Sequence, residues 1–149
     1  MIGATYENLP PWVIQALTQL GEREIRGPRD NPAIRAYHAE TAAGEAPDEV
    51  AWCSSFVNWC FARVQLRGTR SKAASSWRTW GVPSPLRIGA VGFFGKADPD
   101  AKGTGHVFLV LGWDDDWVWG LGGNQKNMVS VARRPRSALE TCRWPAGVP

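Results

Sequence analysis

The spacing of apolar residues changes once along this chain, close to residue 88. Before that point they recur at the three- and four-residue intervals of helices with one buried face. The predicted helices cover residues 10–20, 31–44, 51–66 and 71–80. After it, short apolar runs separated by glycine and aspartate predict strands at residues 90–94, 106–111, 117–121, 128–133 and 141–144. Helices followed by a meander of strands indicate an α+β fold, in which N-terminal helices pack on an antiparallel sheet of about five strands.

The length and charge of the chain limit its function classes. Its 149 residues, 44% of them apolar, suffice for one domain spanning residues 1–149, and no repeat or linker divides them. The 17 basic and 14 acidic residues are spread along the chain, so the net charge of +3 does not indicate a nucleic-acid partner. No stretch fits a membrane span, and residues 1–9 lack the features of a signal peptide. We therefore expect a monomer that is made in the cytoplasm without a signal peptide.

Cysteine and histidine are too few for the common metal sites. The three cysteines, Cys53, Cys60 and Cys142, are an odd number that does not indicate a disulfide framework, so we expect synthesis in a reducing compartment. The two histidines, His38 and His106, exclude a three-histidine zinc site, and neither an HExxH helix nor a CxxC pair is present. We therefore expect no metal and no other cofactor.

Tryptophan is unusually frequent, with nine residues among 149. The usual share is about 1 to 2%. Large aromatic side chains supply much of the burial in a small domain, which favours core positions for most of them. A surface groove that stacks on sugar rings or peptides is the alternative, and the sequence is compatible with some of each.

Three polar residues follow one another in an order that suggests catalysis. Cys53 begins the most hydrophobic predicted helix, where the positive end of the helix dipole lowers the pKa of a thiol. His106 stands at the entry of a predicted central strand and can face that thiol. Asn124 follows the next strand, where an amide accepts the imidazole N–H and fixes its tautomer. Taken singly, the three have plainer interpretations as a buried cysteine, a core histidine and a turn. Their order along the chain is more specific than any one of them and suggests nucleophilic catalysis by a thiol.

The same residues carry a resemblance to a known group of enzymes. The chain resembles the papain-like peptidases of the NlpC/P60 and CHAP kind, and more narrowly a small family of phage-type and bacterial cell-wall hydrolases. The resemblance runs through these blocks: GEREIRGP at 21–28, NPAI at 31–34, AWCSSFVNW at 51–59, SSWRTWG at 75–81, GHVFLVLG at 105–112, LGGNQ at 121–125 and RWP at 143–145. It implies a papain-like α+β fold.

The resemblance also implies roles for single residues. Cys53 is the nucleophile, His106 the general base and then acid, and Asn124 the third member of the triad. Many CHAP-type enzymes have a carboxylate two residues before the asparagine, where this chain has Gly122, so we expect an amide to orient the imidazole and to stabilise its cation less. Related hydrolases commonly read Gly-Asp at the first strand, where this chain has Gly89–Ala90, which leaves a supporting role there in doubt.

The substrate implied by the resemblance is peptidoglycan. Such enzymes cut amide bonds within the stem peptide or its cross-links, as endopeptidases, or between muramic acid and L-alanine, as amidases, and the sequence does not choose between them. Glu24, Trp52, Trp77 and Gln125 are the candidates for contact with the substrate. Glu24 is also a candidate to cap the wall of the active site. Each residue has a structural alternative: a helix-end charge for Glu24, core packing for the two tryptophans, and completion of a turn for Gln125.

Two other function classes stay open at this stage. A tryptophan-rich module that binds the cell wall without cutting it is one, and a cysteine amidase acting on a small amide or a protein is the other. A glycosidase is weaker, because no second carboxylate has a convincing position beside Glu24. A wall substrate outside the cytoplasm also requires a route of release, through a phage holin, a phage particle, or a secretion machine accompanied by an immunity protein.

Overall fold

The computed structural model describes residues 8–95, 103 and 105–149. Its α-helices are α1 (Pro11–Leu17), α2 (Pro32–Ala39) and α3 (Cys53–Ala62), and its 3-10 helices are η2 (Ala74–Thr79) and η3 (Arg136–Ala138). Its strands are β1 (Val82–Pro83), β2 (Val91–Phe94), β3 (His106–Trp113), β4 (Trp117–Gln125), β5 (Met128–Pro135) and β6 (Leu139–Trp144). No helix in this described part is long and apolar enough to cross a bilayer.

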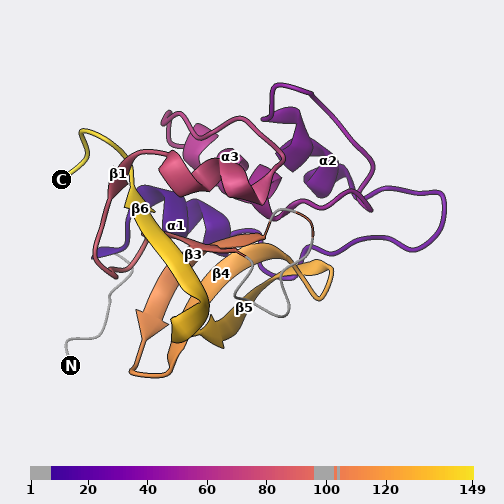
Figure 1. The fold of residues 1–149 in the computed structure, drawn as a ribbon. Helices are drawn as coiled ribbons and strands as arrows, with labels where there is room; N and C mark the ends of the chain where they lie inside the picture. Colours follow the sequence, from indigo (N-terminus) through magenta and orange to yellow (C-terminus); the bar gives the residue numbers. More distant parts are fainter. Residues whose placement is uncertain (1–7, 96–102, 104) are drawn as a thin grey trace.

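The strands form one open antiparallel sheet, in the order β1-β6-β2-β3-β4-β5. Figure 1 shows the three α-helices gathered on one side of this sheet, with α3 across the strands. The predicted α+β fold is confirmed. The sheet has six strands rather than about five because Val82–Pro83 pairs with the end of β6. A strand this short has no sequence period, and proline restricts it to a sheet edge.

The helices begin where the sequence predicts but end earlier. Asn31 caps α2, its side chain accepting a hydrogen bond from the Ala33 N–H at 2.8 Å. The predicted helix at 71–80 is instead the 3-10 helix η2. Hydroxyl groups compete for its backbone groups: Ser76 Oγ donates to the carbonyl of Ala73, and Ser71 Oγ accepts from the Ala73 N–H. These side-chain hydrogen bonds therefore outweigh the apolar spacing that favours an α-helix, and the segment forms a 3-10 helix instead.

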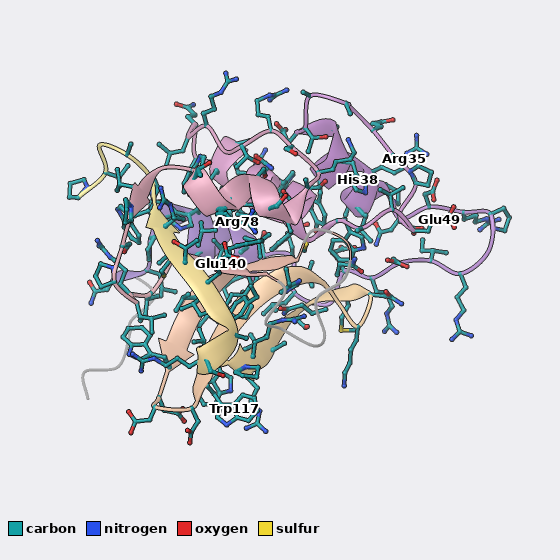
Figure 2. All side chains as sticks on the ribbon, viewed as in Figure 1. Arg35, His38, Glu49, Arg78, Trp117 and Glu140 are labelled. Atoms are coloured by element: carbon teal, nitrogen blue, oxygen red, sulfur yellow. The ribbon has the colours of Figure 1, made fainter. Side chains whose placement is uncertain are left out.

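The core between helices and sheet is largely aromatic. Trp12 packs on Phe61 and edge-on to Trp144, and its indole N–H donates to the carbonyl of Gly89 at 2.8 Å, which ties α1 to the sheet. Four of the nine tryptophans are buried in this core, namely Trp12, Trp52, Trp77 and Trp144. Core filling therefore explains part of the tryptophan content. At the surface, an ion pair between Arg78 of η2 and Glu140 of β6 joins η2 to the sheet (Figure 2).

Candidate active site

Cys53 is the first residue of α3, the helix that packs on β3 and β4. Its side chain is 7% exposed, and the thiol is close to the backbone N–H of Val107, the residue after His106, as well as to the N–H groups of Cys53 and Ser54. These last two belong to the first turn of the helix, where backbone N–H groups have no partner within the helix. The start of α3 thus lies against the start of β3.

His106 is the first residue of β3 and is 5% exposed. Its Nε2 atom lies 2.9 Å from Oε1 of Gln125, and its ring meets Phe108 edge-on. The Gln125 amide is oriented by its other end, because its Nε2 group donates to the carbonyl oxygen of Ser130 at 2.6 Å. Its Oε1 atom therefore accepts, and His106 Nε2 donates. In a neutral imidazole of this tautomer, Nδ1 is the basic nitrogen.

The register of the sheet explains why Gln125 reaches His106. Leu109 pairs with Leu121 across β3 and β4, and an unbroken continuation of that register would place Asn124 opposite His106. The pairing of β4 with β5 shifts just before Gln125, where β4 carries one residue more than its partner. Asn124 lies in this bulge with a φ of 57°. The extra residue changes which side chain faces His106, so the position predicted for Asn124 is taken by Gln125.

Two glycines leave room for this arrangement. A Cβ atom on Gly122 would lie 2.8 Å from the Cβ of Phe108 and 3.0 Å from Oε1 of Gln125. A Cβ atom on Gly123 would lie 2.7 Å from the ring of Trp52, at the foot of α3. The Gln125 side chain therefore lies in the space next to Gly122. A larger residue at position 122 would collide with the Gln125 side chain, so the glycine and the glutamine depend on each other.

Glu24 is hydrogen-bonded to the residues that surround the start of α3, which form one wall of the candidate site. Its Oε1 atom accepts a hydrogen bond from Nε1 of Trp52 at 2.9 Å, and Trp52 directly precedes Cys53. Its backbone N–H donates to the carbonyl of Asn127 in the turn between β4 and β5. The sequence prediction left Glu24 open between substrate contact and a role in the wall, and the bond to Trp52 favours the wall.

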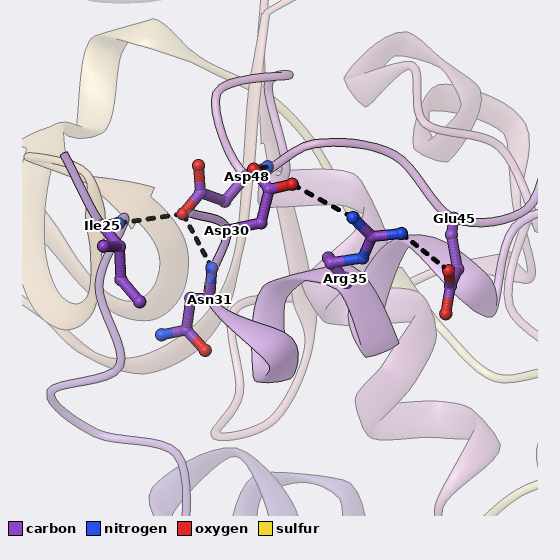
Figure 3. A network of polar contacts seen from close by, with 6 residues as sticks. All are labelled: Ile25, Asp30, Asn31, Arg35, Glu45 and Asp48. Carbon is purple, nitrogen blue, oxygen red and sulfur yellow. Dashed lines mark hydrogen bonds and ion pairs between the residues drawn. The ribbon is translucent and has the colours of Figure 1, made fainter. Parts of the chain in front are cut away.

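A buried carboxylate holds the segment that carries Glu24. Asp48 is 4% exposed, and its Oδ2 atom accepts from the backbone N–H groups of Ile25 and Asn31 at 2.8 and 2.9 Å (Figure 3). Figure 3 also shows Arg35, whose guanidinium pairs with both Asp30 and Glu45. The sequence offers Asp48 as a possible cap of the helix at 51–66, and it does not predict this other role, because the partners are backbone groups 17 and 23 residues away.

Both tryptophans predicted to contact substrate lie inside the core. Trp52 and Trp77 are each 0% exposed, so neither ring has a face open to a groove. The indole N–H of Trp77 donates at 2.8 Å to Oγ of Ser54, which in turn donates to the carbonyl of Ser71. Trp77 therefore fixes the first turn of α3 from behind. The plainer interpretation of both residues, core packing, matches their placement.

The pKa of Cys53 differs from the sequence expectation. Burial raises it above the ordinary value for a thiol, and this effect outweighs the backbone N–H groups of Val107 and Ser54 and the charge of Arg134, which lower it. The helix terminus favours the thiolate as predicted, but desolvation is the larger influence. Arg134 of β5 was not predicted as part of the site, and it is recognisable only once β5 is placed in the sheet.

The described residues contain no group of three His, Cys, Asp or Glu side chains able to hold a metal ion. All three cysteines are buried thiols without a disulfide.

Comparison with known proteins finds a similar fold among solved structures and no match by sequence. Neither a protein-family model nor a curated protein matches the sequence. Among solved structures, the chain is similar to a lipoprotein-like protein of the NLP/P60 family from Staphylococcus aureus subsp. aureus Mu50, with a TM-score of 0.54 and 12% sequence identity. The chain has an NlpC/P60-like fold. The match covers 98% of this chain and 44% of that protein, so the two share one part of the larger molecule.

Proposed function

We propose that this protein is a thiol hydrolase that cleaves an amide bond of peptidoglycan, with Cys53 as nucleophile and His106 as general base. The observation that carries the proposal is the bond from His106 to Gln125 beside the buried start of α3, where Cys53 lies. The NlpC/P60-like fold supports the choice of a wall substrate. The orienting role expected of Asn124 is proposed for Gln125.

The reaction follows from these positions. Nδ1 of His106 takes the thiol proton as the Cys53 sulfur attacks the amide carbonyl, and the backbone N–H of Cys53 helps to hold the oxygen that becomes negative. The imidazolium then gives its proton to the leaving nitrogen, the C–N bond breaks, and a thioester remains. Water, deprotonated by the same imidazole, hydrolyses the thioester and restores the thiol. Gln125 holds the tautomer throughout as a neutral acceptor, so it stabilises the imidazolium less than a carboxylate would.

The proposal covers two kinds of bond in peptidoglycan. An endopeptidase would cut an amide of the stem peptide or its cross-links, and an amidase would cut the amide between muramic acid and L-alanine. Either bond lies outside the cytoplasmic membrane. The proposal therefore includes an export or lysis route, in which a holin or an immunity protein would be the accompanying partner.

The test is digestion of purified sacculi by the wild-type protein and by Cys53→Ala, with mass spectrometry of the released fragments. Cys60→Ala is the matched control, because Cys60 is a buried thiol of the same helix, seven positions further on. We expect release by the wild type and by Cys60→Ala, and none by Cys53→Ala. Equal release by all three would refute a thiol mechanism. Binding of all three to sacculi without any release would indicate a wall-binding protein instead.

A further inference from the structure

A hollow of about 240 Å³ lies beside the candidate site. It is formed between residues 23–26, on the segment held by Asp48, and residues 126–128, at the turn between β4 and β5. We call it the cationic hollow. Its volume is below the range of about 300 to 1,000 Å³ that is usual for pockets enclosing a whole small ligand. It therefore suits a single side chain or a chain end of a longer substrate.

Both walls of the cationic hollow connect directly to the catalytic candidates. On one wall, Glu24 holds the indole of Trp52, the residue before Cys53. On the other, Lys126 is the residue after Gln125, which holds His106. These two links place the hollow next to the residues that flank the proposed nucleophile and the amide that holds its base.

The charge of the cationic hollow is positive because its cations outnumber its carboxylates. Its walls contribute Arg23, Arg26 and Lys126, all exposed, against a single carboxylate, Glu24, which accepts from Trp52. In the part of the chain that the structure describes, no ion pair joins any of these three cations to an acidic side chain. Their charges are therefore available to a ligand.

The neighbouring acidic side chains are occupied as well. Asp48 accepts from backbone N–H groups, Asp30 pairs with Arg35, and Glu22 accepts from the side chain of Asn31. Each of these bonds stays within the segment between α1 and α3. These acidic residues thus stabilise the segment and do not pair with Arg23 or Arg26 of the cationic hollow.

Lys126 occupies a backbone position that does not favour lysine. Lys126 and Asn127 are the two central residues of the turn between β4 and β5, with φ of 54° and 62°. A two-residue hairpin with positive φ at both positions is a type I′ turn, for which Asn and Gly are preferred. A cation at such a position is kept against a local backbone preference, and strain of this kind gathers at functional sites.

We infer that the cationic hollow binds a carboxylate of the peptide next to the scissile amide. The inference rests on the proposed function, since it assigns a subsite to the same substrate. Stem peptides of peptidoglycan carry free carboxylates, and a carboxylate in the hollow would be reached by Lys126 from one wall and by Arg23 and Arg26 from the other. Amidation of that carboxylate would remove the charge and keep the shape.

The experiment uses stem peptides in two forms, one with free carboxylates and one with these converted to carboxamides. Binding to the Cys53→Ala protein is measured by calorimetry, and cleavage by the wild type is measured separately. We expect the free acid to bind several-fold more tightly and this preference to weaken as salt is raised. Lys126→Asn, which suits the turn, and Arg26→Gln should each reduce the preference about two- to five-fold. Arg67→Gln, beyond the C-terminal end of α3 and outside the cationic hollow, should leave it unchanged.

The outcomes separate the inference from the proposed function. Equal binding of the two peptides, no binding of either, or a preference untouched by Lys126→Asn and Arg26→Gln would overturn the subsite. Absence of cleavage by the wild type would count against hydrolysis, while the binding measurements would still decide the subsite.

Discussion

At the scale of single residues, the candidate pair combines a buried thiol with an imidazole held by a neutral amide. Burial raises the pKa of Cys53, and Gln125 has no charge with which to stabilise an imidazolium. Both effects favour the neutral pair over the ion pair before substrate binds. In the proposed mechanism the thiolate therefore forms during the attack, by transfer of the proton to His106.

This resting state predicts the pH dependence of alkylation. The thiolate is the species that reacts with iodoacetamide, and a raised pKa means that it forms only at alkaline pH. The rate of modification at Cys53 should therefore rise through one transition centred above about 8.5, the ordinary pKa of a thiol. The measurement is the rate of appearance of the modified Cys53 peptide by mass spectrometry between pH 5 and pH 10, pH values chosen to bracket that ordinary value.

Peptide mapping keeps this signal apart from that of Cys60 and Cys142, and Cys53→Ala supplies the background. A rate already at its plateau near pH 6 would contradict the prediction, because it would reveal a preformed thiolate and imidazolium pair.

At the scale of elements, the bulge in β4 decides which amide meets His106. The resemblance noted in the sequence implies Asn124 for this role, and an unbroken register between β3 and β4 would also place Asn124 opposite His106. A bulge arises from the pairing of two strands, and the residues of β4 alone carry no signal for it beyond a run of glycines. The chain order of thiol, imidazole and amide was therefore predictable, whereas the choice between two adjacent amides was not.

A pair of neighbouring substitutions tests this assignment. Asn124→Gly keeps a residue that adopts positive φ easily, so stability should change by less than about 1 kcal/mol and the cleavage rate should stay near that of the wild type. Gln125→Ala removes the acceptor that fixes the imidazole tautomer, so kcat/KM should fall by about 100-fold or more. The readouts are fragment release and urea unfolding. A loss in Asn124→Gly as large as that in Gln125→Ala would return the orienting role to Asn124.

The segment between α1 and α2 pairs with the start of β5 at one isolated bridge, between Arg23 and Met128, and Asp48 holds the part that follows, at Ile25 and Asn31. Asp48→Ala removes an acceptor shared by two backbone N–H groups, and we expect it to lower the free energy of unfolding by about 2–3 kcal/mol. Glu49→Ala is the control, since Glu49 is exposed beside it (Figure 2), and its effect should stay within about 0.5 kcal/mol.

Urea unfolding of the two variants and the wild type makes this comparison. Equal stability of Asp48→Ala and Glu49→Ala would show that the segment is held by other contacts.

At the scale of the whole molecule, the order of helices and strands follows from local patterns, but the order of strands in the sheet does not. The helical stretches before residue 81 and the later strands were predicted from apolar spacing and turn residues. The placement of β6 between β1 and β2 depends on contacts between distant segments, which no local pattern encodes. The two-residue strand β1 exists only because β6 lies beside it.

The buried thiol of Cys142 in β6 makes the free energy of unfolding depend on pH in the alkaline range. Burial raises its pKa to about 11, so the folded state keeps its proton at pH values where the unfolded chain loses it. The stabilisation is complete below the unfolded pKa of about 8.5 and is lost as the pH rises through 11. The stability difference between the wild type and Cys142→Ala should therefore fall by about 2–3 kcal/mol across this range.

Urea unfolding at pH 7 and at pH 11 measures this difference, and subtraction of the variant cancels the other groups that titrate there. A difference that stays constant with pH would show that Cys142 ionises as easily in the folded protein as in the unfolded chain.

The central position of β6 also has a consequence for synthesis on the ribosome. Cys53, His106 and Gln125 emerge well before residues 139–144, yet until β6 arrives one edge of β2 has no neighbour. An unpaired edge flanked by buried aromatic residues is a template for pairing with other chains. A nascent chain that ends after β5 therefore holds the proposed nucleophile, base and orienting amide, but we expect it to aggregate before it can act as a smaller enzyme.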